Sequence, residues 1–246
     1  MCGRKTLTKD KTEIIKEYLQ NTDNACFEWN PSFNIAPSQQ TPVLIYKGGR
    51  TIVPMQWGLI PFWAKDRSIG YKMINARSDR LTEKKSFAPL IKQQRCIVIT
   101  DGYYEWKNTG LGKRPYFIFR KDRDFISMAG LWSQWQSDRD KIIHTYTVIT
   151  TEPQQEIAHI HHRMPAIIPK DKIEFWINHT RYDKDMALKL LIPFEEKLNY
   201  YPVTYFVNHP ANNSSLCLQR FESETPGLFL NHSGMTILKD TEGFTF

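Results

Sequence analysis

The sequence predicts a single α+β domain with a curved, barrel-like, mainly antiparallel sheet and peripheral helices. Runs rich in β-branched and aromatic residues dominate the middle of the chain, and the turns between them are short. Short connections favour antiparallel pairing of neighbouring strands. Segments with apolar residues at helical spacing are scattered around these runs. The length of 246 residues leaves room for a sizeable buried core.

The first half of the chain is predicted to contain a helix, a β-hairpin and a second, short helix. Residues 8–20 space their apolar side chains as one face of a helix does. Residues 41–57 are two apolar runs joined by Gly48 and Gly49, which predicts two strands and a tight turn. Residues 86–94 are typical of a short helix.

The second half is predicted to contain strands first and helices later. Five β-rich runs lie at residues 95–100, 102–107, 114–120, 125–135 and 144–150. Residues 151–160 resemble a short helix, capped by Thr150 or Thr151 and with Pro153 in its first turn. The remaining predicted elements are helices at residues 170–179 and 183–192 and a strand at residues 200–208.

Composition and charge restrict the class of protein. The net charge of +7 suits a polyanionic partner such as nucleic acid, but also an ordinary solvated surface. The cysteines at positions 2, 26, 96 and 217 form no C-x-x-C pair and are too few for a disulfide scaffold, which favours a reducing compartment. No apolar run reaches the length of a membrane span, and the first residues lack the apolar core of a secretory signal. We therefore expect a soluble, intracellular protein.

Cys2 stands directly behind the initiator methionine. Removal of Met1 would leave an amine and a thiol on adjacent carbons, an unusual 1,2-aminothiol nucleophile. An α-amine has a pKa of about 7.7–8.0 and a thiol of about 8.5, so a nearby base would help both groups to react. The alternative is a cytosolic thiol with no role.

Two further stretches contain candidate acids and bases. Residues 160–165 (IHHRMP) place His161 and His162 on a tight turn, where a histidine can act as general acid or base or simply be structural. No Cys or carboxylate stands at ligand spacing, so we predict no metal site. Glu105 lies between Tyr104 and Trp106, either on a solvent-facing strand or in an aromatic pocket that raises its pKa.

Two other stretches suit nucleic acid. Residues 74–80 (INARSDR) combine Asn75 with Arg77, and an Arg fork can bind phosphate, although these charges also suit a plain surface. Residues 56–66 (QWGLIPFWAKD) predict a core Trp57, and an exposed Trp63 or Phe beside Pro61 could stack on unpaired bases.

Taken together and in this order, the motifs resemble one family, the SOS response-associated peptidase (SRAP) proteins, which process abasic sites in DNA. The resemblance covers residues 1 to about 208. The matching stretches are MCGR, FNIAPSQ, QWGLIPFWAK, INARSDRL, RCIVITDGYYEW, AGLW, TVITTEP, IHHRMP and YPVTYFVN. Ile99 and Thr100 depart from the Pro-Ala pair more often found in that family.

The resemblance implies a site and a chemistry. Its catalytic residues would be Cys2, Asn75, Glu105 and His161, with Cys2 exposed as the N-terminus and bonded covalently to the aldehyde of a ring-opened abasic sugar. Its DNA-binding residues would be Arg4, Arg77, Trp63, Pro61 and Thr150. The implied partner is single-stranded DNA with an abasic site, without cofactor, metal or membrane. Lyase activity and self-removal of Met1 are also implied.

The family-type catalytic domain would span residues 1–222, and residues 223–246 would form a tail packed on it or loosely docked to it. We expect a monomer, cytoplasmic if bacterial and nuclear if eukaryotic. No C-terminal docking motif of the kind found in longer eukaryotic relatives is evident.

Three other functions are alternatives, two of them enzymatic and one a binding function. An N-terminal-nucleophile amidohydrolase also begins Met-Cys-Gly, but this chain contains no Asn-Gly dipeptide for the oxyanion. A papain-like protease would need a helix carrying the cysteine, which is missing at Cys2. A non-catalytic single-strand-binding module is compatible with the basic, aromatic composition and would not need Cys2.

Overall fold

Five strands close on themselves into a barrel in the computed structural model, which describes residues 2–19, 27–110, 112–136 and 141–222. The barrel strands are β3 (Gln40–Tyr46), β4 (Arg50–Trp57), β6 (Arg95–Thr100), β9 (Ile126–Gln136) and β10 (Ile142–Thr151). The order β4-β3-β6-β9-β10 returns to β4 because β10 pairs with both β9 and β4. Closure leaves no free barrel edge.

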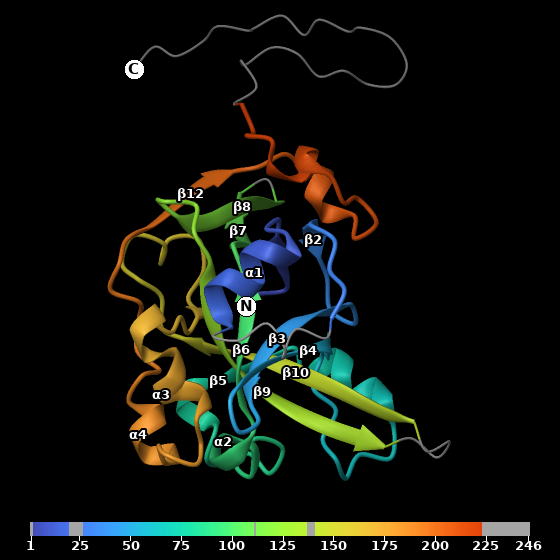
Figure 1. The fold of residues 1–246 in the computed structure, drawn as a ribbon. Coiled ribbons are helices and arrows are strands. Elements are labelled where there is room, and N and C mark those ends of the chain that lie inside the picture. The colour runs from blue at the N-terminus through green and yellow to red at the C-terminus, as the bar shows by residue number, and fades with distance from the viewer. Residues whose placement is uncertain (1, 20–26, 111, 137–140, 223–246) are drawn as a thin grey trace, which may run out of the picture.

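A second, five-stranded antiparallel sheet lies against the barrel, above it in Figure 1. Its order is β12-β8-β7-β1-β2. The strands are β1 (Arg4–Leu7), β2 (Ser32–Ile35), β7 (Gly102–Thr109), β8 (Gly112–Arg120) and β12 (Leu198–Pro202). Only Asp101 separates β6 from β7, so one continuous stretch of chain passes from the barrel into this sheet. The predicted α+β class with a barrel-like sheet is confirmed.

Two pairings of the barrel strand β10 are parallel, with β4 and with β5 (Asn75–Arg77). At its C-terminal end β10 also pairs antiparallel with β11 (Met164–Pro165). Short turns predict antiparallel neighbours correctly for the hairpins, such as β3–β4 around Gly48 and Gly49. Parallel partners need long connections, which a search for short turns does not reveal.

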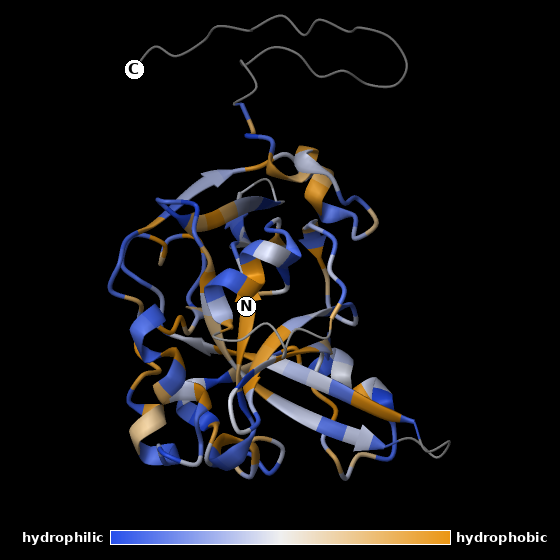
Figure 2. Cartoon of the chain, viewed as in Figure 1, coloured by the Kyte–Doolittle hydropathy of each residue, from blue (hydrophilic) through white to orange (hydrophobic). Residues whose placement is uncertain are grey.

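The barrel interior is apolar and tightly packed. Trp57 is buried, as predicted, and its ring stacks on Tyr146 with 6.3 Å between ring centroids. Figure 2 shows hydrophobic residues on the central strands and mixed hydropathy on the helices around them. Close packing of this kind makes the barrel a rigid support for whatever lies at its rim.

The helices lie outside the sheets. Helix α1 (Lys11–Tyr18) is confirmed, and Asp10 and Glu13 form a capping box at its start. The other predicted helices are shorter than expected: α2 (Leu90–Gln93), α3 (Ile173–Ile177) and α4 (Lys184–Leu188). Among the described residues, no helix is long and apolar enough to cross a membrane.

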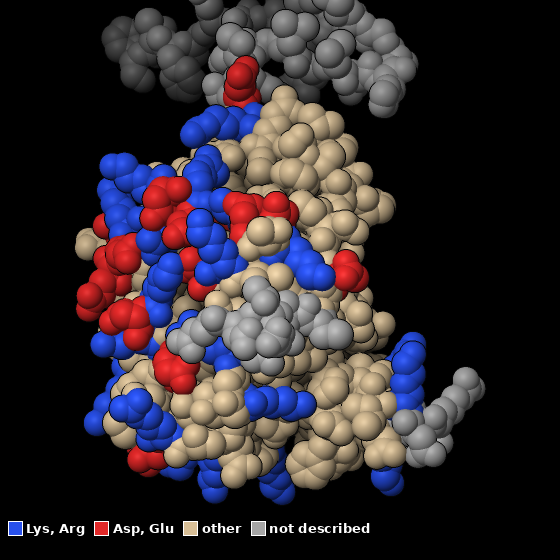
Figure 3. Space-filling model, viewed as in Figure 1, with Lys and Arg blue, Asp and Glu red and all other residues tan. Residues whose placement is uncertain are grey.

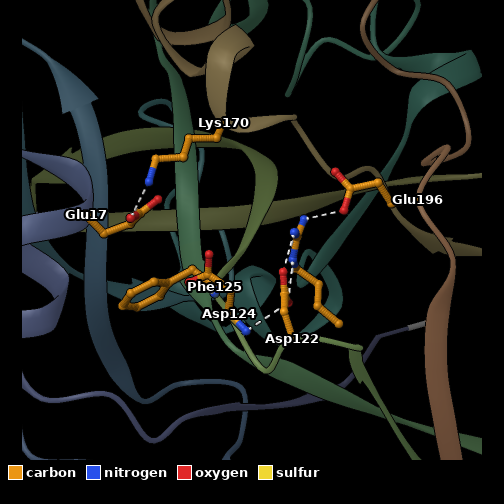
Figure 4. A network of polar contacts seen from close by, with 7 residues as sticks. Glu17, Asp122, Asp124, Phe125, Lys170 and Glu196 are labelled. Carbon is orange, nitrogen blue, oxygen red and sulfur yellow. Dashed lines mark hydrogen bonds and ion pairs between the residues drawn. The ribbon is translucent and has the colours of Figure 1, made fainter.

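Ion pairs join the outer layer of the fold. In the network drawn in Figure 4, Glu17 of α1 pairs with Lys170 at 2.6 Å. Arg120 of β8 pairs with Asp122 at 2.8 Å and with Glu196 at 2.9 Å, which ties the β8–β9 turn to the chain before β12. Pairs this exposed add little stability each, so they align the elements more than they hold them.

The predicted helix over residues 151–160 is wrong. Thr150 and Thr151 are the last residues of β10, and residues 155–160 form successive turns. The Gln154 side chain donates to the carbonyls of Phe194 and Glu196, and these tertiary bonds hold the segment as turns. The turns lead the chain back so that β11 can pair with the end of β10.

The predicted strand over residues 200–208 is half right. Strand β12 ends at Pro202, and Tyr205–Asn208 form the 3₁₀-helix η5. Arg4 and Asn34 donate to the carbonyl of Val207, so the chain is curled against β1 and β2 rather than extended. Cys26 and the predicted tail at residues 223–246 lie outside the described residues.

We expect Gly130→Ala to destabilise the protein by about 1–3 kcal/mol. A Cβ on Gly130 would lie 2.9 Å from Cys96 Sγ, from the Thr147 carbonyl oxygen and from Val98 Cγ2, inside the closed barrel. Thermal unfolding measures the effect. Gly110→Ala is the control, because a Cβ there meets nothing within 4 Å. Equal melting temperatures for the two variants would contradict the tight packing.

Candidate functional site

Strand β1 brings Cys2 beside β7. Arg4 pairs with Tyr104 and Lys5 with Tyr103, and continuing this antiparallel register brings the Cys2 end of β1 alongside Glu105 and Trp106. Cys2 is fully buried, and its thiol lies 3.8 Å from the Arg4 carbonyl oxygen. The N-terminal strand is therefore held in the interior of the sheet.

Asn75 fixes Cys2 from the barrel side. The parallel pairing of β5 with β10 sets Asn75 opposite Val148. Its Nδ2 donates to the Cys2 carbonyl oxygen at 2.8 Å. Its Oδ1 is buried and accepts no hydrogen bond from the described residues, so it is an acceptor available to a group at this site.

Glu105 is only 3% exposed, and burial raises its pKa to about 7. The aromatic-pocket interpretation of Glu105 is therefore the one that the structure favours. A carboxylate with this pKa is divided between its two protonation states near neutrality and can accept a proton there. Burial, and next the charge of Glu105, raise the pKa of the Cys2 thiol to about 12.

His161 approaches Glu105 from the turns after β10. The two residues line a cavity of about 400 Å³ together with Arg4, Trp106, Lys113 and Asn208. The backbone N–H of Arg163 donates to His161 Nδ1 at 3.0 Å, which leaves the proton of the neutral ring on Nε2. Burial lowers the pKa of His161, so the ring is neutral at pH 7 and can donate from Nε2.

Arg4 holds one wall of the cavity in place. Its Nη1 donates to Asn34 Oδ1 at 2.8 Å and to the Val207 carbonyl oxygen at 2.9 Å, and its Nη2 to the Asn208 carbonyl oxygen at 3.4 Å. The guanidinium also lies 5.9 Å from the centroid of the Trp106 ring. Arg4 therefore clamps η5 onto β1 as well as lining the cavity.

Arg77 is exposed at the end of β5. Its Nε and Nη2 bind the two carboxylate oxygens of Asp79 at 3.1 and 2.7 Å. Thr150, its partner on β10, is fully buried, and the Thr150 carbonyl accepts a hydrogen bond from Arg163. The Thr150 hydroxyl is buried and has no hydrogen-bond partner among the described residues.

Pro61 and Trp63 lie in the loop that follows β4. Pro61 is buried, whereas Phe62 and Trp63 are 65% and 51% exposed. Trp63 lines a separate hollow of about 250 Å³ with Lys65 and Lys72. Neither Pro61 nor Trp63 lines the cavity that contains Glu105 and His161. Pro61 can support the exposed rings but does not itself present a surface for stacking.

Sequence reasoning missed three side chains of the cavity wall. Trp106 Nε1 donates to Asn208 Oδ1 at 2.8 Å, and Lys113 completes the rim. Trp106 adjoins Glu105 in the chain, which was a usable signal. Asn208 is about a hundred residues away, and only the return of η5 to β1 brings it to the site. The described residues contain no group of three or more His, Cys, Asp or Glu that could hold a metal ion.

Comparison with known proteins identifies the family. The model of the SOS response associated peptidase (SRAP) family matches residues 1–210. The chain belongs to the SRAP family. It is 39% identical to the abasic site processing protein YoqW of Bacillus subtilis, over 87% of this chain and 97% of that one. It is 34% identical to the abasic site processing protein HMCES of Gallus gallus, over 80% and 68% of the two chains.

Solved structures share the fold of this chain. A protein from Bacteroides thetaiotaomicron shares 28% identity and superposes with a TM-score of 0.77, over 89% of this chain and all of that one. A protein from Bordetella bronchiseptica, 20% identical, shows the same fold with a TM-score of 0.69, over 82% of this chain.

We expect the buried Glu105 to make stability depend on pH. Its pKa of about 7 in the folded protein exceeds the value of about 4.3 in an unfolded chain, so the folded state binds the proton more tightly. The contribution of Glu105 to stability is then highest below about pH 4.3. It falls as pH rises to 7 and stays lower by about 4 kcal/mol above pH 7.

Denaturant titrations of wild type and Glu105→Gln between pH 4 and 8 measure this effect. The variant should lose the decline, because its amide does not titrate. Glu83→Gln, at an exposed position, serves as the control. A decline of equal size in wild type and Glu105→Gln would mean that Glu105 is not the group responsible.

Proposed function

We propose that this SRAP protein captures abasic sites in single-stranded DNA by a covalent bond to Cys2 after loss of Met1. The central supporting observation is the arrangement of Cys2, which Asn75 holds by its carbonyl beside a buried Glu105 with a pKa of about 7. Relatives named abasic site processing proteins support the substrate. The cavity lined by Glu105 and His161 offers space for one sugar.

The first step is ring opening and amine attack. His161, neutral, donates a hydrogen bond from Nε2 to the ring oxygen of the closed sugar and so assists ring opening. The C1′ hydroxyl gives up its proton, the ring oxygen takes one up, and the C1′ aldehyde is released. Glu105 takes a proton from the Cys2 α-ammonium, and the free amine attacks C1′. The carbonyl oxygen leaves as water, and an imine joins the protein to the DNA. Asn75 Oδ1 accepts a hydrogen bond from the amine or the sugar.

The second step closes the ring. The Cys2 sulfur adds to the imine carbon, a C–S bond forms, and the imine nitrogen takes up the proton that the thiol gives up. The product is a five-membered thiazolidine, which resists hydrolysis because reversal must first break the C–S bond. The sulfur is already attached to the reacting nitrogen by two carbons, so closure gains effective concentration.

The pKa values set the order of these steps. A buried thiol with a pKa of about 12 is almost entirely protonated at neutral pH. The negative charge of ionised Glu105, which helps to remove a proton from the amine, disfavours the thiolate form of Cys2. The amine therefore reacts first, and the thiol gives up its proton only as it adds to the imine.

The DNA is held outside the cavity. Arg77 and Arg4 bind flanking phosphates, and the exposed Trp63, supported by Pro61, stacks on an unpaired base. Thr150 contributes through the β10–β5 pairing that positions Arg77. The same imine acidifies the C2′ protons and can lead to strand cleavage by β-elimination. We also propose that the cavity assists removal of Met1, so that the protein would have the peptidase activity that the family name describes.

We expect Cys2 to be required for a heat-stable crosslink. Protein whose intact mass confirms loss of Met1 is mixed with a single-stranded oligonucleotide containing one abasic site and run on a denaturing gel. Wild type should give a shifted band, and Cys2→Ala should give one only after borohydride, because its amine forms an imine but cannot form the thiazolidine.

The outcomes separate the function classes. A stable band from untreated Cys2→Ala would overturn the thiazolidine, and no band from wild type would overturn covalent capture. If Cys2→Ala keeps its DNA affinity and wild type gives no adduct, the protein is a simple binding module. Glutamine hydrolysis that depends on Cys2 would instead support an amidohydrolase.

We also expect the crosslinking rate to rise with pH through about 7. Glu105 acts as a base only when ionised, and its pKa is about 7. Single-turnover rates between pH 5 and 8.5 measure this dependence. Glu105→Gln should be slower by about 10²–10⁴-fold and should lose that limb of the profile. The hypothesis fails if Glu105→Gln retains both the rate and the pH dependence of wild type.

A further inference from the structure

A second surface beside the cavity has features suited to single-stranded nucleic acid. It consists of Lys113 and Arg114 at the start of β8 and of Tyr205 and Phe206 in η5; we name it the β8–η5 surface. Lys113 lines the cavity rim together with Asn208. Asn208 is the last residue of η5, so this surface is continuous with the cavity. Lys113 is shared with the cavity rim, whereas Arg114, Tyr205 and Phe206 do not line the cavity.

The 3₁₀ geometry of η5 places Tyr205 on the side of the helix that leads to the cavity. Residues three apart in a 3₁₀-helix lie on the same side, so Tyr205 shares a side with Asn208 and lies one turn farther from the cavity. Tyr205 is 47% exposed and Phe206 is 38% exposed. In Figure 3 the upper right of the molecule, where the chain around η5 lies in Figure 1, shows almost no charged residues. Exposed aromatic rings next to a reactive cavity provide a platform for bases.

Arg114 is held rigidly next to Tyr205. Its guanidinium carbon lies 3.6 Å from the centroid of the Phe221 ring and 5.6 Å from that of Tyr205. An arginine braced on an aromatic ring loses little freedom when it binds a phosphate, and its planar fork suits that group. The Arg114 guanidinium can therefore bind a phosphate while the neighbouring Tyr205 ring stacks on a base.

The cations of this surface are not neutralised nearby. Within the part of the chain that the structure describes, neither Lys113 nor Arg114 has a carboxylate within ion-pair distance, unlike Arg77 with Asp79. The two sequence stretches that build the surface, residues 106–121 and 197–221, contain no Asp or Glu at all. A polyanion is the partner that this charge distribution favours.

We propose that the β8–η5 surface binds the single strand where it leaves the cavity, with phosphates on Lys113 and Arg114 and a base stacked on Tyr205. This inference rests on the proposed function and extends it, since it adds a subsite for nucleotides that flank the abasic one. The protein would then have two separate aromatic surfaces on which bases can stack, one at Trp63 and one at Tyr205. Affinity then depends on nucleotides on both sides of the lesion.

The test uses strands that bind without reacting. Each oligonucleotide contains one tetrahydrofuran residue, an abasic analogue without an aldehyde, and is either short or extended by about six nucleotides on its 5′ or its 3′ side. Fluorescence anisotropy measures the gain in affinity that each extension gives. The gain is compared within each variant, so a general loss of binding does not imitate the expected result.

Extension on either side should tighten binding to wild type, and Tyr205→Ala should reduce the gain on one of the two sides about tenfold. Tyr205→Phe should restore it, because stacking needs the ring and not the hydroxyl. Lys113→Gln and Arg114→Gln should each lower the slope of log affinity against log salt by about 0.7. Lys189→Gln, an exposed charge on the far end of the fold, is the matched control and should change neither quantity.

The two proposals fail separately. If Tyr205→Ala keeps the full gain on both sides, or if the salt slopes of Lys113→Gln and Arg114→Gln equal that of Lys189→Gln, the β8–η5 surface is not a subsite. If wild type gains affinity on extension but forms no covalent product with a natural abasic site, covalent capture is wrong, and the proposal that the β8–η5 surface is a subsite is kept.

Discussion

The insertion of β1 between β7 and β2 is the constraint on which the site depends. This short strand contains only four residues, yet its pairing on both sides fixes the position of Cys2 beside β7. Asn75 then secures the Cys2 carbonyl from the barrel side. An N-terminus is normally among the least ordered parts of a domain. Here backbone hydrogen bonds from two strands and one side chain give it a defined place.

Burial of this strand also determines the chemistry. The same loss of solvent raises the pKa of Glu105 to about 7, raises that of the Cys2 thiol to about 12 and lowers that of His161. One physical effect thus yields a base that works near neutrality, a neutral hydrogen-bond donor and a protonated thiol. In a solvent-exposed version of these side chains water would return each pKa toward its ordinary value, so Glu105 would be fully ionised at neutral pH and a much weaker base.

The arginines and lysines near the site differ in how many hydrogen bonds and ion pairs they already make within the protein. Arg4 gives its hydrogen bonds to Asn34 and the η5 carbonyls, and Arg77 is paired with Asp79. A ligand phosphate would have to compete with these partners. Lys113 at the cavity rim has no such competitor among the described residues, so a phosphate can bind there without displacing a carboxylate. The distribution of partners therefore matters more for DNA binding than the net charge of +7.

Local sequence patterns determined the strands of the barrel, helix α1 and the candidate chemistry of Cys2, Glu105 and His161, since alternation, helical spacing and residue type all act over a few neighbours. Only the tertiary structure decided the parallel partners of β10, the turns at residues 155–160 and the approach of Asn208 to Trp106. Each of these depends on hydrogen bonds between segments far apart in the chain. The same long-range packing removes water from Glu105, which no reading of its sequence neighbours could establish, because a pKa responds to everything that surrounds the group in space.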